Sequence, residues 1–311
     1  MGRIGMSARF IPTASGPSAT GGAAGGGGGS GGGSLYPFSS HSFTTCGSSG
    51  DYGPQLSNCR SSYSTDWVND TEYFDMDYRG IQRWKIPQTG SYWFDARSGS
   101  GRAYSSNQRR GYGGRIQGQF ELTQGLWLEI AISQGGWGSG GSAGGTFIIL
   151  FDGGSTRTPL LIVGGGGGQD GRYSHTNGDW DGGTNGKNAS DGYSGGSNGN
   201  GGQGPGGNGT AGCGYYTNSN DTRGHYSYLQ SGNTPNSNSL RGDYNGGGFG
   251  GGGGSTDDQG SGGGGWSGGA GTAENSTGGA GGSYFNTSYG SGRQNSGSQT
   301  STHGVFNLTK Q

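Results

Sequence analysis

The chain has 311 residues, of which 83 are glycine, and hydrophobic residues make up only 25% of it. This apolar content is too low for an ordinary core of that size, so long glycine segments are by default expected to be disordered. The formal net charge is −1, which lacks the basic excess that is typical of nucleic-acid binding. Nucleic acid is therefore not expected among the partners.

Residues 1–34 form the first element in chain order: a mixed stretch followed by a flexible Gly/Ala/Ser linker. We expect an attachment segment here, and a frayed terminus is the alternative interpretation. The segment has no apolar run of signal-peptide length, and no run of about 18 apolar residues occurs anywhere in the chain. A particle component that is released by lysis fits both observations.

Three cysteines, Cys46, Cys59 and Cys213, are present. Their odd number and the absence of a C-x-x-C spacing argue against a zinc or redox site. Cys46 and Cys59 could form one disulfide that closes a short loop, which would favour an oxidising compartment. Two buried free thiols are the alternative.

Residues 35–163 contain short runs rich in Ile, Phe, Trp and Tyr, and several of these runs alternate apolar and polar residues. This pattern predicts β-strands separated by turns. The expected strands are Ser42–Cys46, Gly80–Ile86, Ser91–Ala96, Arg115–Leu122, Leu126–Ser133, Thr146–Phe151 and Pro159–Val163. No long stretch has helical periodicity, so we expect an all-β sandwich or jelly roll.

Residues 164–302 are dominated by glycine, with poly-Gly runs at 164–168, 250–254 and 262–265. A strand-like run follows at 303–311. Because a loose tail would not need a returning strand, we expect the glycine region to be an insertion inside the β-domain, which the last strand closes.

Glycine backbones lack Cβ atoms and can approach one another closely on all sides. In the polyproline-II conformation they have three residues per turn, and neighbouring chains can pair their outward-pointing N–H and C=O groups. We expect residues 164–302 to form such a bundle of polyglycine-II helices with variable loops. Collagen is excluded, because the chain has only 8 prolines and lacks the three-residue glycine period.

Several motifs follow one another in a distinctive order. HSFTTCGSSGDYGPQLSNC (41–59) is followed by GIQRWKIPQTGSY (80–92), GQFELTQGLWLEIAISQGG (118–136), GGTFIILFDGGSTRTPLLIVGGGGG (144–168) and HGVFNL (303–308). This order resembles the glycine-rich extracellular domain of the anaplastic lymphoma kinase and leukocyte tyrosine kinase receptors. The resemblance covers residues 41–311 and implies a TNF-like β-sandwich with polyglycine-II helices inserted between its strands.

The same domain type is similar to one that recurs in bacteriophage virion proteins. Polyglycine-helix bundles also resemble the tip adhesins of T-even-type tail fibres, in which variable loops contact the host. The chain shows no signal peptide, membrane span, kinase or cysteine-rich neighbour. We therefore expect a virion structural protein, a tail-fibre or particle-surface adhesin for a host glycan or outer-membrane protein. The alternative is a secreted or receptor-type eukaryotic module that binds a protein ligand.

Aromatic residues between the glycine runs are the expected contact residues, because Tyr and Trp give large contact areas at low entropy cost. They are Tyr173, Trp180, Tyr193, Tyr215, Tyr216, Tyr226, Tyr228, Tyr244 and Trp266. The alternative is that these rings cover the ends of the glycine bundle. Further expected partners are other virion proteins, through residues 1–34, and additional copies of the chain.

Other motifs carry weaker signals. Acidic residues cluster at positions 66, 70, 72, 75 and 77, where we expect a solvated loop and, as the less favoured alternative, a hard-cation site. Arg241-Gly242-Asp243 is an RGD tripeptide, for which integrin binding is a weak hypothesis in so glycine-rich a chain. No pair of nucleophile and base stands out, so neither an enzyme nor a cofactor is expected.

Overall fold

The computed structural model describes residues 33–103, 110–169, 176–205, 209–220, 225–230, 234–256, 259–273, 276–299 and 301–311. The chain divides into one unit at Met1–Gly33 and a second at Ser34–Gln311, which contains every helix and strand named below. Apart from residues 33 and 34, the expected attachment segment therefore lies outside the described residues.

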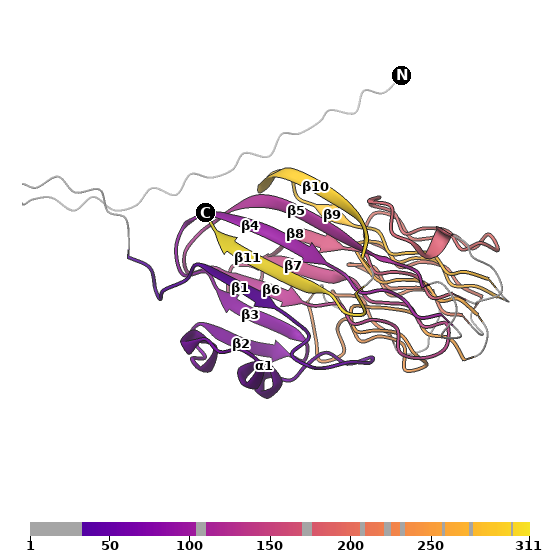
Figure 1. Ribbon diagram of the computed structural model, residues 1–311, viewed down its shortest axis with the longest axis horizontal. Helices are drawn as coiled ribbons and strands as arrows, with labels where there is room; N and C mark the ends of the chain where they lie inside the picture. Colours follow the sequence, from indigo (N-terminus) through magenta and orange to yellow (C-terminus); the bar gives the residue numbers. More distant parts are fainter. Residues whose placement is uncertain are drawn as a thin grey trace, which may run out of the picture. The chain divides into compact units, whose positions relative to one another are not determined.

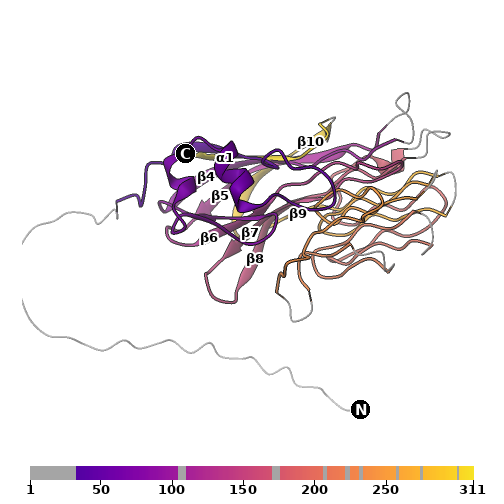
Figure 2. The same ribbon diagram turned by 90° about the horizontal axis from the view of Figure 1, so that it is seen from below.

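The described strands of the second unit form two antiparallel sheets (Figures 1 and 2). The first sheet has the order β1 (Ser40–Phe43), β11 (Val305–Lys310), β4 (Gly90–Arg97), β5 (Gly113–Leu122) and β10 (Gly290–Gln299). The second has the order β2 (Phe74–Tyr78), β3 (Ile81–Lys85), β6 (Trp127–Ala131), β7 (Thr146–Phe151), β8 (Arg157–Val163) and β9 (Tyr284–Phe285). The expected all-β sandwich is confirmed at this level.

The main core lies between the two sheets and is built from aromatic and branched side chains. In β5, Ile116, Phe120 and Leu122 are buried and alternate with polar residues that are exposed or half-buried. The ring centroids of Phe94 and Phe120 lie 4.4 Å apart in the first sheet, and those of Phe120 and Phe285 lie 4.9 Å apart across the two sheets. The period of two in the sequence thus marks the face of each strand that enters this core.

Three strands are not among those predicted from the sequence: β2, β9 and β10. The residues of β2 (FDMDY) do alternate between apolar and polar, whereas β9 has only two residues. The sequence of β10 is GSGRQNSGSQ, which contains glycine and polar residues but no apolar side chain. The strand lies at the edge of its sheet and is held by antiparallel backbone pairing with β5. Both β9 and β10 fall inside the range 164–302, so this range supplies strands as well as glycine segments.

Short helical segments also occur: α1 (Leu56–Ser62) and the 3-10 turns η1 (Asp66–Asn69) and η2 (Thr176–Gly178). Only Cys59 of α1 is buried, so this helix has no apolar face that periodicity would detect. A disulfide joins Cys59 to Cys46, with Cα atoms 4.9 Å apart, and so ties α1 to the segment after β1. None of the helices in the described residues is long and apolar enough to cross a membrane.

The glycine segments are ordered by a regular pattern of backbone hydrogen bonds. Along 261–266, residues three apart donate to the same neighbouring segment, with N···O distances of 2.8 to 3.3 Å. Ser261 and Gly264 donate to Gly140 and Ala143, Gly262 and Gly265 to Thr210 and Cys213, and Gly263 and Trp266 to Gly279 and Gly282. Three successive N–H groups therefore point to three different neighbours. This repeat is three residues long, unlike the period of two in a β-strand.

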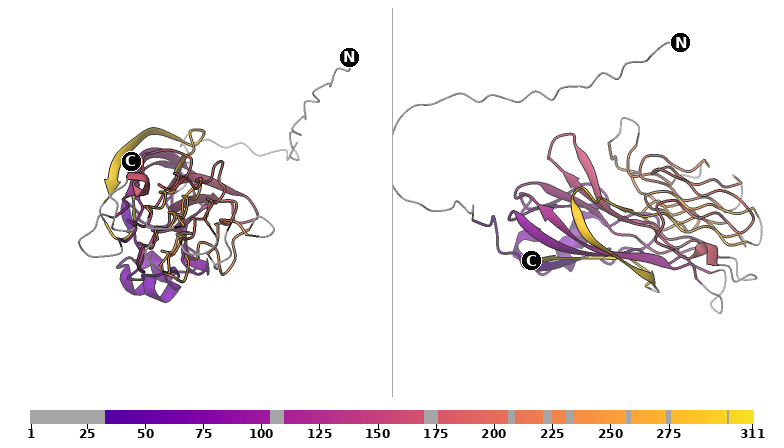
Figure 3. Two further views of the ribbon diagram at one scale, coloured as in Figure 1. Left: turned by 90° about the vertical axis from the view of Figure 1, so that its right-hand side faces the viewer. Right: turned by 90° about the horizontal axis from the view of Figure 1, so that it is seen from above.

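A second run repeats the pattern and links the glycine region to the loops of the sandwich. Gly166 and Gln169 donate their N–H groups to Gly99 and Arg102, again with steps of three residues. The acceptors at 99–102, like those at 140–143, precede residue 164. The hydrogen-bonded glycine layer is thus assembled from loops on both sides of that residue, and Figure 3 shows its segments side by side.

Glycine is required at these positions because the backbones approach too closely for a side chain. A Cβ atom on Gly168 would lie 1.7 Å from the carbonyl oxygen of Gly140, and one on Gly281 would lie 2.1 Å from that of Gly264. Real Cβ contacts are never that short, so the neighbouring backbone would have to move. The packing of the layer therefore depends on the absence of side chains.

A second apolar cluster lies between the glycine region and the outer face of the second sheet. The sheet contributes Ile81, Ala131, Phe147, Ile149 and Ile162, and the glycine region contributes Tyr215, Tyr228, Leu229, Leu240 and Phe249. The second sheet is consequently covered on both faces. This explains why TFIILF in β7 and PLLIV in β8 are continuous apolar runs that do not alternate.

Replacing Gly263 with alanine should destabilise the protein by about 1–3 kcal/mol, because the new methyl group would lie 2.2 Å from the carbonyl oxygen of Gly165. Gly154→Ala is the matched control, since an added Cβ there meets nothing closer than 3.5 Å. Urea denaturation of both variants measures the free energy of unfolding. Equal stabilities of the two variants would contradict the tight backbone packing.

His41 in β1 is enclosed by the rings of Phe43, Tyr63 and Trp67, whose centroids lie 4.5 to 4.9 Å from that of the imidazole. Burial lowers the pKa of His41 from 6.5 to about 4. Its Nε2 atom is buried and makes no hydrogen bond with the described residues. Between these two pH values the unfolded chain therefore binds a proton that the folded chain does not.

The free energy of unfolding should decrease as the pH falls from about 6.5 to about 4, and the contribution of His41 should be complete above that window. His41→Phe keeps a ring but cannot titrate, so this variant should lose less stability over the same range. Chemical denaturation at several pH values measures both profiles. Parallel profiles would exclude His41 as a cause, since His303, whose pKa burial also lowers, is present in both proteins.

Candidate binding surface

The aromatic residues expected to contact a partner have different degrees of exposure. Tyr173 lies outside the described residues. Three of the rings are buried: Trp180, Tyr215 and Tyr228. Three are half-buried: Tyr193, Tyr226 and Trp266. Two are exposed: Tyr216 at 48% and Tyr244 at 54%. The buried rings therefore fit the alternative role, in which they cover the glycine region, better than they fit direct contact with a partner.

Three of these rings, together with those of Tyr284 and Phe147, form one stacked column. Adjacent centroids lie 4.4 Å apart between Tyr284 and Trp266, 5.4 Å between Trp266 and Tyr215, 5.2 Å between Tyr215 and Tyr228, and 5.9 Å between Tyr228 and Phe147. The interplanar angles are 12° to 25°. The column thus connects half-buried rings with the buried Phe147 of β7, and it fixes their orientation.

Tyr216 packs against the accessible end of this column. Its ring meets those of Tyr215 and Trp266 edge-on, at centroid distances of 4.8 and 5.4 Å. A Cβ on Gly199 would lie 2.4 Å from the ring of Tyr216, so this glycine makes room for the tyrosine. We call Tyr216, Trp266 and Tyr284 the aromatic platform. The buried rings of the column fix the orientation of its accessible ring surface.

The buried end of the column is anchored by a charged group. The hydroxyl of Tyr228 donates to the carboxylate of Glu129, which is fully buried in β6. Arg157 in β8 donates to both oxygens of the same carboxylate, at 2.8 and 2.9 Å. Burial by itself lowers the pKa of Arg157, but its hydrogen bonds with Glu129 raise it above the ordinary value. Glu129 therefore keeps a charged partner and a neutral donor inside the protein.

Burial and the charge of Glu129 raise the pKa of Tyr228 well above 10. Its hydroxyl consequently stays protonated and acts as a donor at neutral pH. No sequence pattern predicts this link, since residues 129 and 228 are far apart in the chain. The sequence did contain a weaker signal. Glu129 lies in the otherwise apolar run LWLEIAIS, and a carboxylate that is buried with such a run needs a buried hydrogen-bond or ion-pair partner.

The RGD tripeptide does not form an accessible integrin motif. Asp243 is fully buried and accepts a hydrogen bond of 2.9 Å from Thr210. Arg241 pairs with Asp51 at 3.0 Å and lies over the ring of Tyr52. The integrin hypothesis is therefore wrong for this chain: folding places both charged groups in internal contacts.

Asp243 also lies near the one serine–histidine pair that stands out among the described residues. Ser219 and Nε2 of His225 form a hydrogen bond, while Nδ1 of His225 is 3.7 Å from the carboxylate of Asp243, beyond hydrogen-bonding distance. All three residues are buried. The arrangement has the residue types of a catalytic triad, but a substrate would have to reach a buried serine. It holds loops of the glycine region together.

The acidic cluster is divided among separate contacts. Glu72 faces Lys85 at 3.4 Å, Asp77 pairs with Arg83, and Asp70 accepts the backbone N–H of Glu72. No group of three or more metal-ligating side chains lies together in the described part of the chain. The expected solvated loop is found only at Asp70 and Glu72, because Asp66 lies in η1 and Asp75 and Asp77 lie in β2. The cation alternative has no ligand set among the described residues there.

Tyr228→Phe should lower the free energy of unfolding by about 1–2 kcal/mol, because it removes one hydrogen-bond donor from the buried carboxylate of Glu129. Tyr244→Phe is the matched control: it removes the same hydroxyl from an exposed ring and should change stability little. Urea denaturation measures both. A loss for Tyr244→Phe as large as that for Tyr228→Phe would show that the link to Glu129 is not the cause.

Comparisons with known proteins show a partial similarity. The leukocyte tyrosine kinase receptor of Mus musculus is 32% identical to this chain over 95 residues. The aligned part is 30% of this chain and only 11% of the receptor, so the chain spans a small fraction of that relative. No protein-family profile matches the chain. The similarity agrees with the receptor resemblance of the sequence motifs, over a limited stretch.

Proposed function

We propose that the protein is a structural component of a bacteriophage particle, an adhesin on a tail fibre or on the particle surface that binds the host. In this proposal it is not an enzyme. The sandwich is a TNF-like jelly roll, and the glycine segments are polyglycine-II helices. The three-residue hydrogen-bond repeat along 261–266 supports the helix assignment.

One observation carries the proposal: the glycine region holds a fixed set of rings, of which Tyr216 is exposed and Trp266 and Tyr284 are half-buried. The aromatic platform stacks on the buried rings of Tyr215 and Tyr228, and the hydroxyl of Tyr228 donates to the buried carboxylate of Glu129. Rings that are already ordered lose little conformational entropy when they bind. Such a surface suits a glycan or a loop of an outer-membrane protein on the host. The rim of the layer can change in sequence while its backbone bonds remain.

The attachment partner is another virion protein, bound through residues 1–34. The binding partner is the host receptor, and additional copies of the chain are candidate neighbours in the particle. Mass spectrometry of purified phage particles, with antibody labelling in electron microscopy, tests the location. Absence of the protein from purified particles would refute it.

Tyr216→Ala should weaken binding of the fluorescently labelled protein to host cells by about tenfold or more, which corresponds to roughly 1.4 kcal/mol. Tyr289→Ala is the matched control, because Tyr289 is also an exposed tyrosine, at 43%, but lies outside the platform. Flow cytometry over a concentration series measures both. Unchanged binding of Tyr216→Ala would refute the platform as the contact surface.

A second candidate function follows from the partial similarity to the leukocyte tyrosine kinase receptor. In this alternative the chain is a secreted or receptor-type eukaryotic module that binds a protein ligand. Recovery of the protein from eukaryotic membranes or secretions, and not from phage particles, would favour it over the adhesin.

A further inference from the structure

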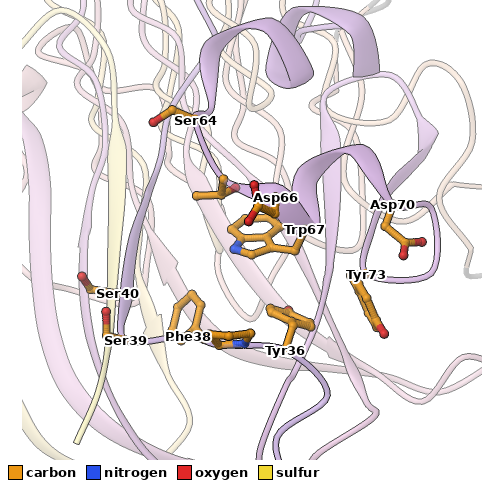
Figure 4. A pocket seen from close by; sticks show the side chains of 11 residues that line it. Tyr36, Phe38, Ser39, Ser40, Ser64, Asp66, Trp67, Asp70 and Tyr73 are labelled. Carbon is orange, nitrogen blue, oxygen red and sulfur yellow. The ribbon is translucent and has the colours of Figure 1, made fainter.

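A cavity of about 480 Å³ lies far from the aromatic platform in the sequence, between the segment that leads into β1 and the segment that joins α1 to β2 (Figure 4). Four aromatic side chains form much of its wall: Tyr36, Phe38, Trp67 and Tyr73. Its volume falls within the range of roughly 300–1,000 Å³ that is common for small-molecule sites. None of the sequence motifs assigned a role to these residues as a group.

The aromatic wall is held in place by the core behind it. Tyr36 packs on Tyr73 and Trp67, with centroid distances of 4.6 and 6.1 Å, and its hydroxyl donates to the carbonyl of Lys85. Phe38 packs on the buried Trp84 at 4.8 Å. The 3-10 turn η1 carries Asp66 and Trp67 on the opposite side of the cavity. Ring faces at the cavity are therefore preformed.

Polar groups without internal partners border the same space. Asp66 is exposed, and its carboxylate forms no hydrogen bond or ion pair with the described residues. The Oγ1 atom of Thr65 is buried and has no hydrogen-bond partner in the described part. Figure 4 shows the indole nitrogen of Trp67 directed toward the side where Ser39 and Ser40 lie. The cavity thus offers carboxylate acceptors, hydroxyl groups and an indole donor.

These features together select the chemistry of an occupant. No lysine, arginine or histidine lines the cavity, and its two aspartates are acidic, so an anionic ligand is disfavoured. A purely apolar ligand would leave the hydroxyls and carboxylates desolvated without partners. A simple ammonium cation would use the rings and carboxylates but not the donors. A ligand with one apolar face and a rim of hydroxyl groups satisfies all of them.

We propose that this cavity binds a neutral pyranose, a single sugar residue of a glycan. One C–H face of the ring packs on the aromatic wall, and its hydroxyl groups donate to Asp66 and Asp70 and accept from the serine, threonine and indole donors. This site is distinct from the aromatic platform and goes beyond the proposed function. The cavity can bind sugar whether or not the protein is a phage adhesin, and the platform can bind a host whether or not the cavity binds sugar.

The test uses the full chain and the methyl glycosides of glucose, galactose, mannose and N-acetylglucosamine. Saturation-transfer NMR detects the sugar, and tryptophan fluorescence follows the change at Trp67. We expect saturable binding of at least one neutral glycoside in the millimolar range and about tenfold or more weaker binding of glucuronate. Asp66→Asn and Phe38→Ala should each weaken the binding by about tenfold or more.

Glu121→Gln is the charge-matched control, because Glu121 is exposed in β5 and does not line the cavity. It should bind sugar as the unmodified protein does. If circular dichroism shows that Phe38→Ala is unfolded, the Asp66→Asn variant alone tests the proposal. Asparagine has nearly the same shape as aspartate, and the side chain at this position is exposed, so this variant should fold. The proposal is overturned if no neutral glycoside binds, if Asp66→Asn binds unchanged, or if tetramethylammonium binds and the glycosides do not.

The outcome is separable from that of the adhesin proposal. Sugar binding that is lost in Asp66→Asn, together with unchanged attachment of that variant to host cells, would support the cavity and leave the platform as the host contact. Loss of host attachment in Tyr216→Ala with normal sugar binding would assign the two activities to two surfaces.

Discussion

The protein depends on lateral hydrogen bonding between backbones that carry no side chains. Each N–H group along 261–266 has an acceptor in a neighbouring segment, and three such segments surround the run. Only glycine permits this approach, since a Cβ on Gly168 would lie 1.7 Å from a carbonyl oxygen. This explains how the chain combines a high glycine content with a low apolar content. Its interior is filled largely by backbone whose polar groups are hydrogen-bonded to one another, in place of apolar side chains.

Backbone bonds alone do not determine where the glycine layer sits on the sandwich, because every glycine segment offers similar groups. The side chains at the second sheet supply this specificity. Tyr228 joins Phe147 of β7 through stacking and Glu129 of β6 through its hydroxyl. Arg157 then pairs with the same carboxylate. A single buried charge with two directional partners tolerates little displacement, so it fixes the register of the layer against the sheet.

The sequence predicts those elements whose stability comes from alternating side chains, such as β4 and β5. It does not predict β10, which is held by backbone pairing, or α1, in which only Cys59 is buried. The continuous apolar runs of β7 and β8 did contain a usable signal, namely a sheet covered on both faces. Tyr216 and Trp266 of the aromatic platform are among the aromatic residues that the sequence singles out, and their role in binding stays a prediction. The separation of those aromatic residues into buried and exposed rings was not predictable, because it follows from contacts between distant segments.

Tyr215 and Tyr216 show why residue type could not make that separation. Both residues lie in a bend of the chain, side by side in the sequence. The backbone bonds of Gly212 and Tyr215 to Gly269 and Trp266 place Tyr215 toward the column, where its ring is buried. Tyr216 instead donates its N–H group to Gly199, and 48% of this residue is exposed. Burial and exposure are thus decided by the backbone hydrogen bonds that each tyrosine makes with a different neighbouring segment, and residue type alone does not reveal those bonds.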